Sequence, residues 1–473
     1  MAKKKITNEE KLSQKKETAW QGIKKAEEKR IYDFAEDFKD FLTKAKTERE
    51  SVELIVAAAK KKGFKPLSSY KKLKAGDKVI FTNMGKTAAL AVIGKDPIEK
   101  GMKVVASHID TPRIDLKQQP LYEDVDSELA LFKTHYYGGI KKYQWANIPL
   151  AIHGIIVNSK GETIKVTIGE DPEDPVFIIG DLLPHLSHKA QAERKMAEVL
   201  KGEELRVIVG NRPSNEKDAK AKLKLNVLEL LNSKYGIVEE DLISAELQIV
   251  PATPARDVGL DRSMVGGYGQ DDRVNAFTSM RAILDVQKPK KTALALFFDK
   301  EEVGSIGATG AQGGFFELAV GEILEKAVPN YRYSILKRAM ANSRALSADV
   351  DAAVHPMFKS VHELGNAARV GHGIGLCKFG GARGKSGSND ANAEFLGELR
   401  RLFNEKKVPW QFTELGKVDE GGGGTVARFL SEHNLEVIDC GPPLISMHSP
   451  FEISSKVDVY STYRAFVEFH NAE

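Results

Sequence analysis

The chain has 473 residues, of which 42% are hydrophobic and 29% charged, a composition typical of a soluble protein with roughly two or three domains. Its 70 basic and 66 acidic residues leave a net charge of +4, which is too small to favour nucleic acid or an acidic membrane surface as a partner. No stretch approaches the roughly 18 consecutive apolar residues of a membrane helix, so we expect no membrane partner either.

The compartment is predicted from the cysteines and from the N-terminal residues. Cys377 and Cys440 are the only cysteines, too few for a disulfide framework and consistent with a reducing interior. The basic start at residues 1–5 resembles that of a signal peptide, but Glu9 and Glu10 stand where its apolar core would be. We therefore expect a cytoplasmic protein whose basic start is a solvated tail.

Helical patterns dominate the N-terminal part of the chain. Phe34, Phe38 and Phe41 recur at helical spacing. Thr47 followed by Glu50 is a capping-box pattern, which predicts the start of a second helix. We expect these helices to form a layer packed on a sheet.

Short strands are expected next, at 79–81, 88–93 and 104–106. The last of them is apolar without alternation, which is typical of a strand buried on both faces. Further along, residues 148–180 alternate apolar and polar side chains between Gly and Asp turns, which indicates a small β-rich unit. A linker containing proline and glycine follows at 251–259.

Buried strands alternate with helical patterns again in the second half of the chain. The strands are expected at 294–298, 344–348, 435–439 and 444–447. Such alternation predicts an α/β fold with a mixed, largely parallel sheet sandwiched by helices. The expected organisation is a catalytic α/β domain formed by residues 1–116 and 251–473, interrupted by a β-rich domain inserted at 117–250.

Polar side chains stand where the predicted strands end, and in one loop that leads into a helix. The candidates for chemistry are His108, Asp110, Asp271, Asp272, Glu301, Glu302, Asp349 and His448. In an open α/β sheet, ligands bind in the crevice at the carboxyl ends of the strands. Residues far apart in the sequence could therefore converge on one site.

The residue types indicate a metal site. Histidine with several carboxylates and without cysteine suits Zn²⁺, or a neighbour such as Mn²⁺ or Co²⁺. There are more carboxylates than one ion needs, which favours a pair of ions about 3.5–4 Å apart. Such a pair lowers the pKa of a bridging water and polarises a carbonyl oxygen, the chemistry that hydrolyses an amide.

Two of these motifs leave alternatives open. Asp110 stands two residues after His108 and could accept its second ring N–H, although His-x-Asp also occurs in plain surface turns. Glu301 and Glu302 could be a ligand beside a general base, or two exposed acids that open a helix. The residues alone do not decide which glutamate has which role.

The run Gly421–Gly424 also has two interpretations. It could be a glycine turn that lets the backbone approach a substrate, or a plain flexible turn. A phosphate loop is not expected, because no Lys-Ser/Thr pair follows the glycines.

These segments, taken in order, resemble the aminopeptidase I / aspartyl aminopeptidase family of dinuclear zinc metallopeptidases, and most closely its bacterial aminopeptidase I-like branch. The resemblance covers nearly the whole chain. It rests on Ser107–Pro112, Gly269–Arg273, Asp299–Ser305, Ser347–Asp349, His355–Pro356 and Met447–Ser449. Each motif alone is weakly specific, but six motifs in the same order are a specific signal.

The resemblance implies a ligand set for two divalent ions in each subunit. Zinc is the expected metal, and manganese or cobalt are alternatives. The ligands would be His108, Asp271, Glu302, Asp349 and His448. Asp271 rather than Asp272 would bridge the ions, because the family's bridging Asp is followed by Asn or Asp.

The resemblance also implies catalytic roles. Glu301 would take a proton from the bridging water and return it to the leaving amine, and Asp110 would orient His108. The insertion at 117–250 would be a dimerisation domain, with dimers assembled into a tetrahedral dodecamer whose inner chamber admits short peptides. His185 would reach from the dimerisation domain into a neighbouring subunit's site and bind the substrate carbonyl.

The sequence does not decide which N-terminal residue the enzyme prefers. It could be an acidic residue, or a neutral or hydrophobic one. Family members that prefer acidic residues have a lysine in the specificity pocket, and Lys378 and Lys385 are both candidates for it. Against an acidic preference, Asp351 and Ala352 depart from the aspartyl branch, which has histidine at the latter position. The surroundings of His108 also look closer to the aminopeptidase I branch.

Two other functions are alternatives to the aminopeptidase. One is another two-metal amide hydrolase, such as a carboxypeptidase or an N-acyl deacylase. The other is a non-catalytic assembly protein on the same fold, against which Glu301 and a complete ligand set argue.

Overall fold

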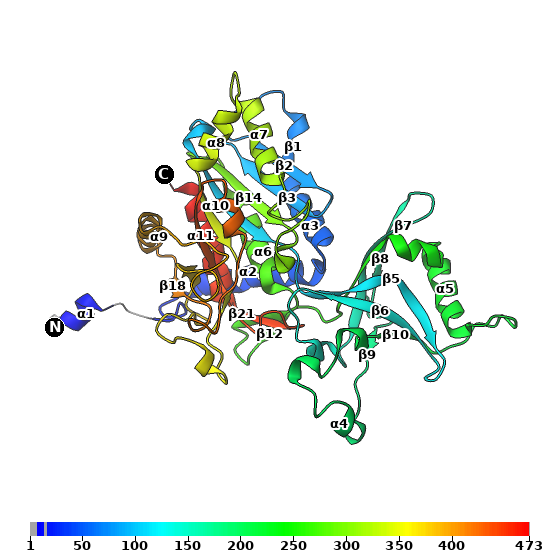
Figure 1. Ribbon diagram of the computed structural model, residues 1–473. Coiled ribbons are helices and arrows are strands. Elements are labelled where there is room, and N and C mark those ends of the chain that lie inside the picture. The colour runs from blue at the N-terminus through cyan, green and yellow to red at the C-terminus, as the bar shows by residue number, and fades with distance from the viewer. Residues whose placement is uncertain (1–6, 14–16, 473) are drawn as a thin grey trace.

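The structure is a computed structural model that describes residues 7–13 and 17–472 of the chain, so the basic start at 1–5 lies outside the described residues. It contains three sheets, one of which forms the centre of a helix-covered unit (Figure 1). Within the described ranges, no helix has both the length and the apolar character needed to cross a membrane.

The largest sheet has nine strands, and its central strands are parallel. Their order is β1 (Lys65–Pro66), β2 (Lys78–Asn83), β3 (Thr87–Val92), β14 (Thr292–Phe298), β4 (Met102–His108), β15 (Arg344–Ala348), β19 (Glu436–Gly441), β17 (Ile374–Cys377) and β18 (Trp410–Thr413). Strands β14, β4, β15 and β19 run parallel, whereas β3 and β17 are antiparallel to their neighbours in this central group. The predicted mixed, largely parallel sheet is confirmed.

Helices cover both faces of this sheet because its strands carry apolar side chains on both faces. In β4, Val104 and Ala106 belong to the core on one face, and Val105 belongs to the core on the other. One face is covered by α2 (Lys25–Lys44), α3 (Glu48–Lys61), α6 (Gln270–Asp285), α9 (Ala393–Glu405) and α11 (Lys456–Asn471). The other is covered by α7 (Phe315–Ala327), α8 (Tyr333–Ala341) and α10 (Ala427–Ser431).

Two sequence patterns in the N-terminal helices are explained by local contacts. At the start of α3, the Thr47 side chain accepts from the Glu50 backbone, and the Glu50 side chain accepts from the Thr47 backbone. This reciprocal pair is the predicted capping box. Phe34, Phe38 and Phe41 of α2 are buried against α6, as their helical spacing indicates. A short helix, α1 (Asn8–Leu12), precedes α2.

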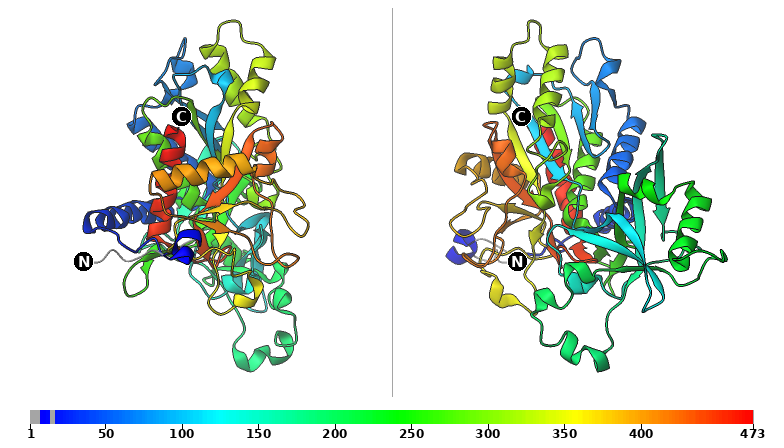
Figure 2. Two further views of the ribbon diagram at one scale, coloured as in Figure 1. Left: turned by 90° about the vertical axis from the view of Figure 1, so that its left-hand side faces the viewer. Right: turned by 45° about the vertical axis from the view of Figure 1, so that its right-hand side comes forward.

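The second sheet has seven antiparallel strands and a core of its own, which includes the fully buried Trp145. Its order is β8 (Thr163–Ile168), β7 (Leu150–Val157), β11 (Ala245–Pro251), β5 (Arg113–Asp124), β6 (Leu129–Tyr137), β10 (Val207–Gly210) and β9 (Ile178–Ile179). Helix α5 (Lys222–Tyr235) packs on it and ends at the left-handed Gly236. A shorter helix, α4 (Pro184–Ala190), lies at the bottom of all three views, away from the nine-stranded sheet (Figures 1 and 2).

The third sheet is small and changes one expectation. Its order is β12 (Arg256–Val258), β13 (Met264–Gly267), β21 (Glu452–Ser455), β20 (Pro443–Ile445) and β16 (Asp351–Ala352). The strand expected at 444–447 is thus β20, which lies outside the main sheet and ends earlier. It ends there because the backbone turns at Ser446 and His448, where φ is 63° at both residues.

Candidate metal centre

The centre of the site is built from the ends of adjacent parallel strands. His108 is the last residue of β4. Glu301 and Glu302 open a short 3-10 turn directly after β14, and Asp349 follows β15. Because β14 and β15 pair with β4 on its two sides, the three strand ends present their side chains at one edge of the sheet.

The remaining two candidates come from loops that enter this edge. Asp271 lies at the start of α6, where its own backbone and that of Asp272 are not helical, and the peptide bond between them is cis. His448 lies in the turn between β20 and β21. The structure therefore brings together all five predicted ligands and Glu301.

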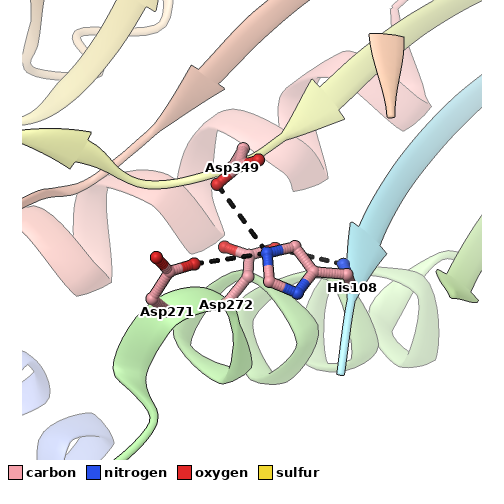
Figure 3. Close-up of side chains that lie close together, drawn as sticks. All are labelled: His108, Asp271, Asp272 and Asp349. Carbon is pink, nitrogen blue, oxygen red and sulfur yellow. Dashed lines mark hydrogen bonds and ion pairs between the residues drawn. The ribbon is translucent and has the colours of Figure 1, made fainter. Parts of the chain in front are cut away.

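One group of ligand atoms gathers around His108 (Figure 3). Its Nε2 atom lies 3.2 Å from Asp271 Oδ1 and 3.9 Å from Asp349 Oδ1. These residues, together with Asp272, present ligand atoms within 4.8 Å of one another. Such a set can hold one cation.

A second group gathers around His448. Its Nε2 atom lies 3.2 Å from Asp271 Oδ2 and 3.5 Å from Glu302 Oε2. Asp271 thus belongs to both groups, with one oxygen facing His108 and the other facing His448. This arrangement is the one a bridging carboxylate needs. A third combination, His108 with Glu301 and Glu302, overlaps both groups.

Polar atoms without partners indicate that the residues fit a metal. Asp271 Oδ1 and Glu302 Oε1 are buried and have no hydrogen-bond partner, an unfavourable state for a carboxylate unless a cation is bound. Burial, and next the charge of Asp271, raises the pKa of Glu302 well above its usual range. Burial, and next the charge of Asp272, does the same for the pKa of Asp349. Nitrogen and oxygen donors without sulfur suit zinc and its first-row neighbours.

Asp272 differs from Asp271 in how its oxygens are used. Its Oδ2 accepts a hydrogen bond from the backbone N–H of His108 at 3.2 Å, and its Oδ1 accepts one from Asn275 Nδ2 at 2.6 Å. Asp272 is therefore engaged by the protein on both oxygens. It holds the end of β4 against α6.

Asp110 contacts both the His108 ring and the backbone of the two glutamates. Its Oδ1 lies 3.3 Å from His108 Nδ1, although the Asp110 main-chain oxygen lies slightly closer to that nitrogen, at 3.1 Å. Its carboxylate also accepts the backbone N–H groups of Glu301 at 3.1 Å and Glu302 at 3.2 Å. Asp110 thus fixes the turn that carries both glutamates as well as the histidine ring.

Three contributors to the site are not among the residues predicted from the sequence. Glu452 is fully buried, and its two oxygens accept the backbone N–H groups of His448 at 2.7 Å and Asp271 at 3.1 Å. From the seven-stranded unit, the Tyr137 hydroxyl donates to Asp110, and the Gly139 carbonyl oxygen lies 3.0 Å from His448 Nδ1. The only sequence signal was a carboxylate four residues after His448, since a backbone carbonyl leaves no mark in residue type.

His185 does not lie with this group within one chain. It is exposed on α4, which stands apart from the nine-stranded sheet (Figure 1). The structure also separates the two candidate lysines. Lys385 lines the cavity beside the site, whereas Lys378 is exposed and is not part of the lining.

A cavity of about 710 Å³ opens directly from the candidate ligands. The loop that contains Gly421–Gly424 forms part of its wall. A Cβ atom on Gly421 would clash with the carbonyl oxygen of Leu415, and one on Gly422 would clash with that of Gly381. These glycines therefore allow close packing between the loops that shape the cavity.

The chain is similar to known proteins over nearly its full length. The sequence model of the family described as aminopeptidase I zinc metalloprotease (M18) matches residues 41–470. A relative from Clostridium acetobutylicum, named a probable M18 family aminopeptidase 1, is 49% identical over 457 residues, or 96% of this chain and 97% of the relative. A relative of the same name from Thermotoga maritima is 46% identical over 460 residues, or 96% of this chain and 98% of the relative.

Solved structures agree with this assignment. The crystal structure of an M18 family aminopeptidase from Thermotoga maritima has a TM-score of 0.93 at 45% identity, and the match covers 98% of this chain and 100% of that one. The crystal structure of aminopeptidase I from Clostridium acetobutylicum has a TM-score of 0.90 at 47% identity, covering 97% and 100%. The expected class of enzyme, a metal-dependent aminopeptidase, is confirmed by these matches. The chain belongs to the aminopeptidase I zinc metalloprotease (M18) family.

Proposed function

We propose that this chain removes the N-terminal residue of peptides with the help of two divalent ions. His108, Asp271 and Asp349 would hold one ion, and Asp271, Glu302 and His448 would hold the other. The observation that carries this proposal is the position of Asp271, whose two oxygens face the two histidines at 3.2 Å each. When bound, the ions would supply an activated water and an electrophile for the substrate carbonyl.

Zinc is the proposed metal, with manganese or cobalt as alternatives, because the family is one of zinc metalloproteases and the donors are nitrogen and oxygen alone. Asp110 would keep His108 in the tautomer that exposes Nε2 to the site. The Gly139 carbonyl oxygen would do the same for His448.

Glu301 is the proposed general base and acid. Glu301 and Glu302 both line the cavity, but the Glu301 side chain is 16% exposed and the Glu302 side chain 5%. A base must reach both the attacking water and the leaving amine, so the more open position suits it. Burial raises the pKa of Glu301 to about 7, although the charge of His108 opposes the shift.

The test of an aminopeptidase against its closest rivals is the requirement for a free amine. We expect hydrolysis of a short peptide with a free N-terminus, the same rate when its C-terminus is amidated, and none when its N-terminus is acetylated. Loss of hydrolysis on amidation would instead indicate a carboxypeptidase. Release of acetate from the acetylated peptide would indicate an N-acyl deacylase.

We also propose that residues 117–250 form a dimerisation domain, that dimers assemble further into a dodecamer, and that the protein is cytoplasmic. A structure of Saccharomyces cerevisiae mApe1, described as a dodecamer, has a TM-score of 0.74 to this chain at 21% identity. Leu182, Leu183 and Leu186 are exposed around α4, which supports a partner that covers them. His185 lies among these leucines and would enter the site of a neighbouring subunit. Free Cys377 and Cys440 suit a reducing compartment.

A further inference from the structure

The cavity beside the candidate metal centre has an acidic inner wall. Asp351 and Asp439 line it and are 8% and 5% exposed, and the partly buried Glu414 lines it with them. In the part of the chain that the structure describes, no lysine or arginine forms an ion pair with any of these carboxylates. The same cavity is lined by Glu301 and Asp349, so it is continuous with the centre.

The sheet register places polar side chains in this wall. Ser347, Asp439, Cys377 and Thr413 are successive partners across β15, β19, β17 and β18, so their side chains share one face. Asp439 Oδ1 accepts a hydrogen bond of 2.6 Å from Thr425 Oγ1. Thus Asp439 is held in place by a neutral donor and has no ion-pair partner among the described residues.

Asp351 is held in a similar way. Its Oδ1 accepts a hydrogen bond of 3.1 Å from the backbone N–H of Ala352, again a neutral group. Thr413 Oγ1 is buried in the same region and has no hydrogen-bond partner. Buried carboxylates that have only neutral donors are favourable sites for an incoming cation.

The positive side chains that line the cavity are all exposed to solvent. Arg383, Lys385 and Lys417 line the cavity and are exposed. Lys385 is already paired with Asp390 at 2.8 Å and lies over the Phe379 ring, 4.0 Å from its centroid. These side chains are solvated or engaged, so the inner wall stays acidic.

We propose that this cavity receives the N-terminal residue of the substrate and selects a cationic side chain, lysine or arginine. The inference rests on the proposed function, which requires that residue to lie beside the ions. An acidic side chain would lie against the carboxyl groups of Asp351 and Asp439, whereas a cationic one would give them the ion-pair partner that they lack among the described residues. Val350 and Leu415 also line the cavity and suit the apolar stem of a long cationic side chain.

The test compares lysyl, arginyl, norleucyl, alanyl and glutamyl chromogenic substrates on the metal-loaded enzyme. Norleucine has a lysine-like stem without the ammonium group, so the lysyl-to-norleucyl ratio of kcat/KM isolates the charge. We expect this ratio to be at least about tenfold, as for a hydrogen bond to a charged group. Asp351→Asn and Asp439→Asn should each lower it by about tenfold.

The ratio is measured on one preparation, so a variant that folds only in part does not change it. Asp33→Asn, on the exposed surface of α2, is the matched control and should leave the ratio as it is. Norleucyl or glutamyl hydrolysis as fast as lysyl, or an unchanged ratio in both pocket variants, would overturn this inference and leave the proposed function standing. No turnover of any substrate would overturn both.

Discussion

The hydroxyl of Tyr137 donates a hydrogen bond of 2.7 Å to Asp110 Oδ2, and so connects the seven-stranded unit to the base of the metal centre. Asp110 in turn contacts His108 and the backbone of Glu301 and Glu302. A residue of the unit proposed for dimerisation thus reaches the ligand shell through a single intermediate. Changes in that unit should therefore alter the chemistry at the centre.

Replacing Tyr137 with phenylalanine tests this connection. The Tyr137→Phe variant keeps the ring but leaves Asp110 without its hydroxyl donor. We expect metal affinity to fall by up to about tenfold, the lower end of the range for residues that hold a metal ligand in place, because Asp110 stands between Tyr137 and His108. Titration of the metal-free protein measures it. Tyr136→Phe, the exposed neighbour on β6, is the control and should bind metal as the wild type does.

Glu301→Gln should abolish turnover while both ions stay bound. The amide keeps the size of the side chain but cannot take a proton from water, and general acid–base catalysis contributes about 10²–10⁴-fold. Metal content by elemental analysis, measured beside kcat, separates this role from ligation. Glu302→Gln is the paired variant and should lose metal as well as activity. Turnover of Glu301→Gln near the wild-type rate would contradict the proposed roles.

The sequence predicts the parts of this site that depend on local patterns. His108 and Asp349 could be recognised because each follows a short apolar run, and Asp110 because it stands two residues after a histidine. The division of roles between Glu301 and Glu302 needed the family resemblance, because neighbouring carboxylates carry the same chemistry.

Other parts of the site depend on contacts between distant segments and could not be predicted. The carbonyl oxygen of Gly139 holds His448, but every residue has a carbonyl oxygen, so none is marked by type. Glu452 acts on two backbone N–H groups, whose position only the fold determines. The placement of β20 in the small sheet likewise depends on its pairing with β21 and β16.

Metal removal should stop hydrolysis, and return of Zn²⁺, Mn²⁺ or Co²⁺ should restore it. The ions bind the folded state and not the unfolded state, so the melting temperature should rise when metal is returned. Absence of hydrolysis both before removal and after return, across the substrate panel, would support a non-catalytic assembly protein instead.

The metal-free protein should also become less stable as pH rises. Burial raises the pKa of Glu452 to about 8 in the folded state, and the charge of Asp271 adds to this shift. The folded state then binds more protons than the unfolded one, whose glutamates titrate near 4.3. The stabilising contribution is complete below about pH 4 and is lost as pH rises towards 8.

Thermal unfolding between pH 5 and 9, with and without metal, measures this effect. Asp458, whose pKa burial raises to about 8, titrates in both forms, so the difference between the two curves reports on the centre. The metal-loaded protein should lose less stability over this range, because cations favour the charged carboxylates. Parallel curves would contradict the assignment of Glu452 to the metal centre.

His185 should act on the site of a neighbouring subunit, and mixed oligomers test this directly. His185→Ala and Glu301→Gln should each be nearly inactive alone. In a mixed dimer, the subunit that keeps Glu301 receives His185 from its partner, so one complete site is restored. Random exchange makes about half of the dimers mixed, with one of two sites complete, which predicts recovery of about a quarter of wild-type activity. His188→Ala, an exposed histidine on the same helix, is the control and should be active alone. No recovery after verified subunit exchange would show that His185 does not act across subunits.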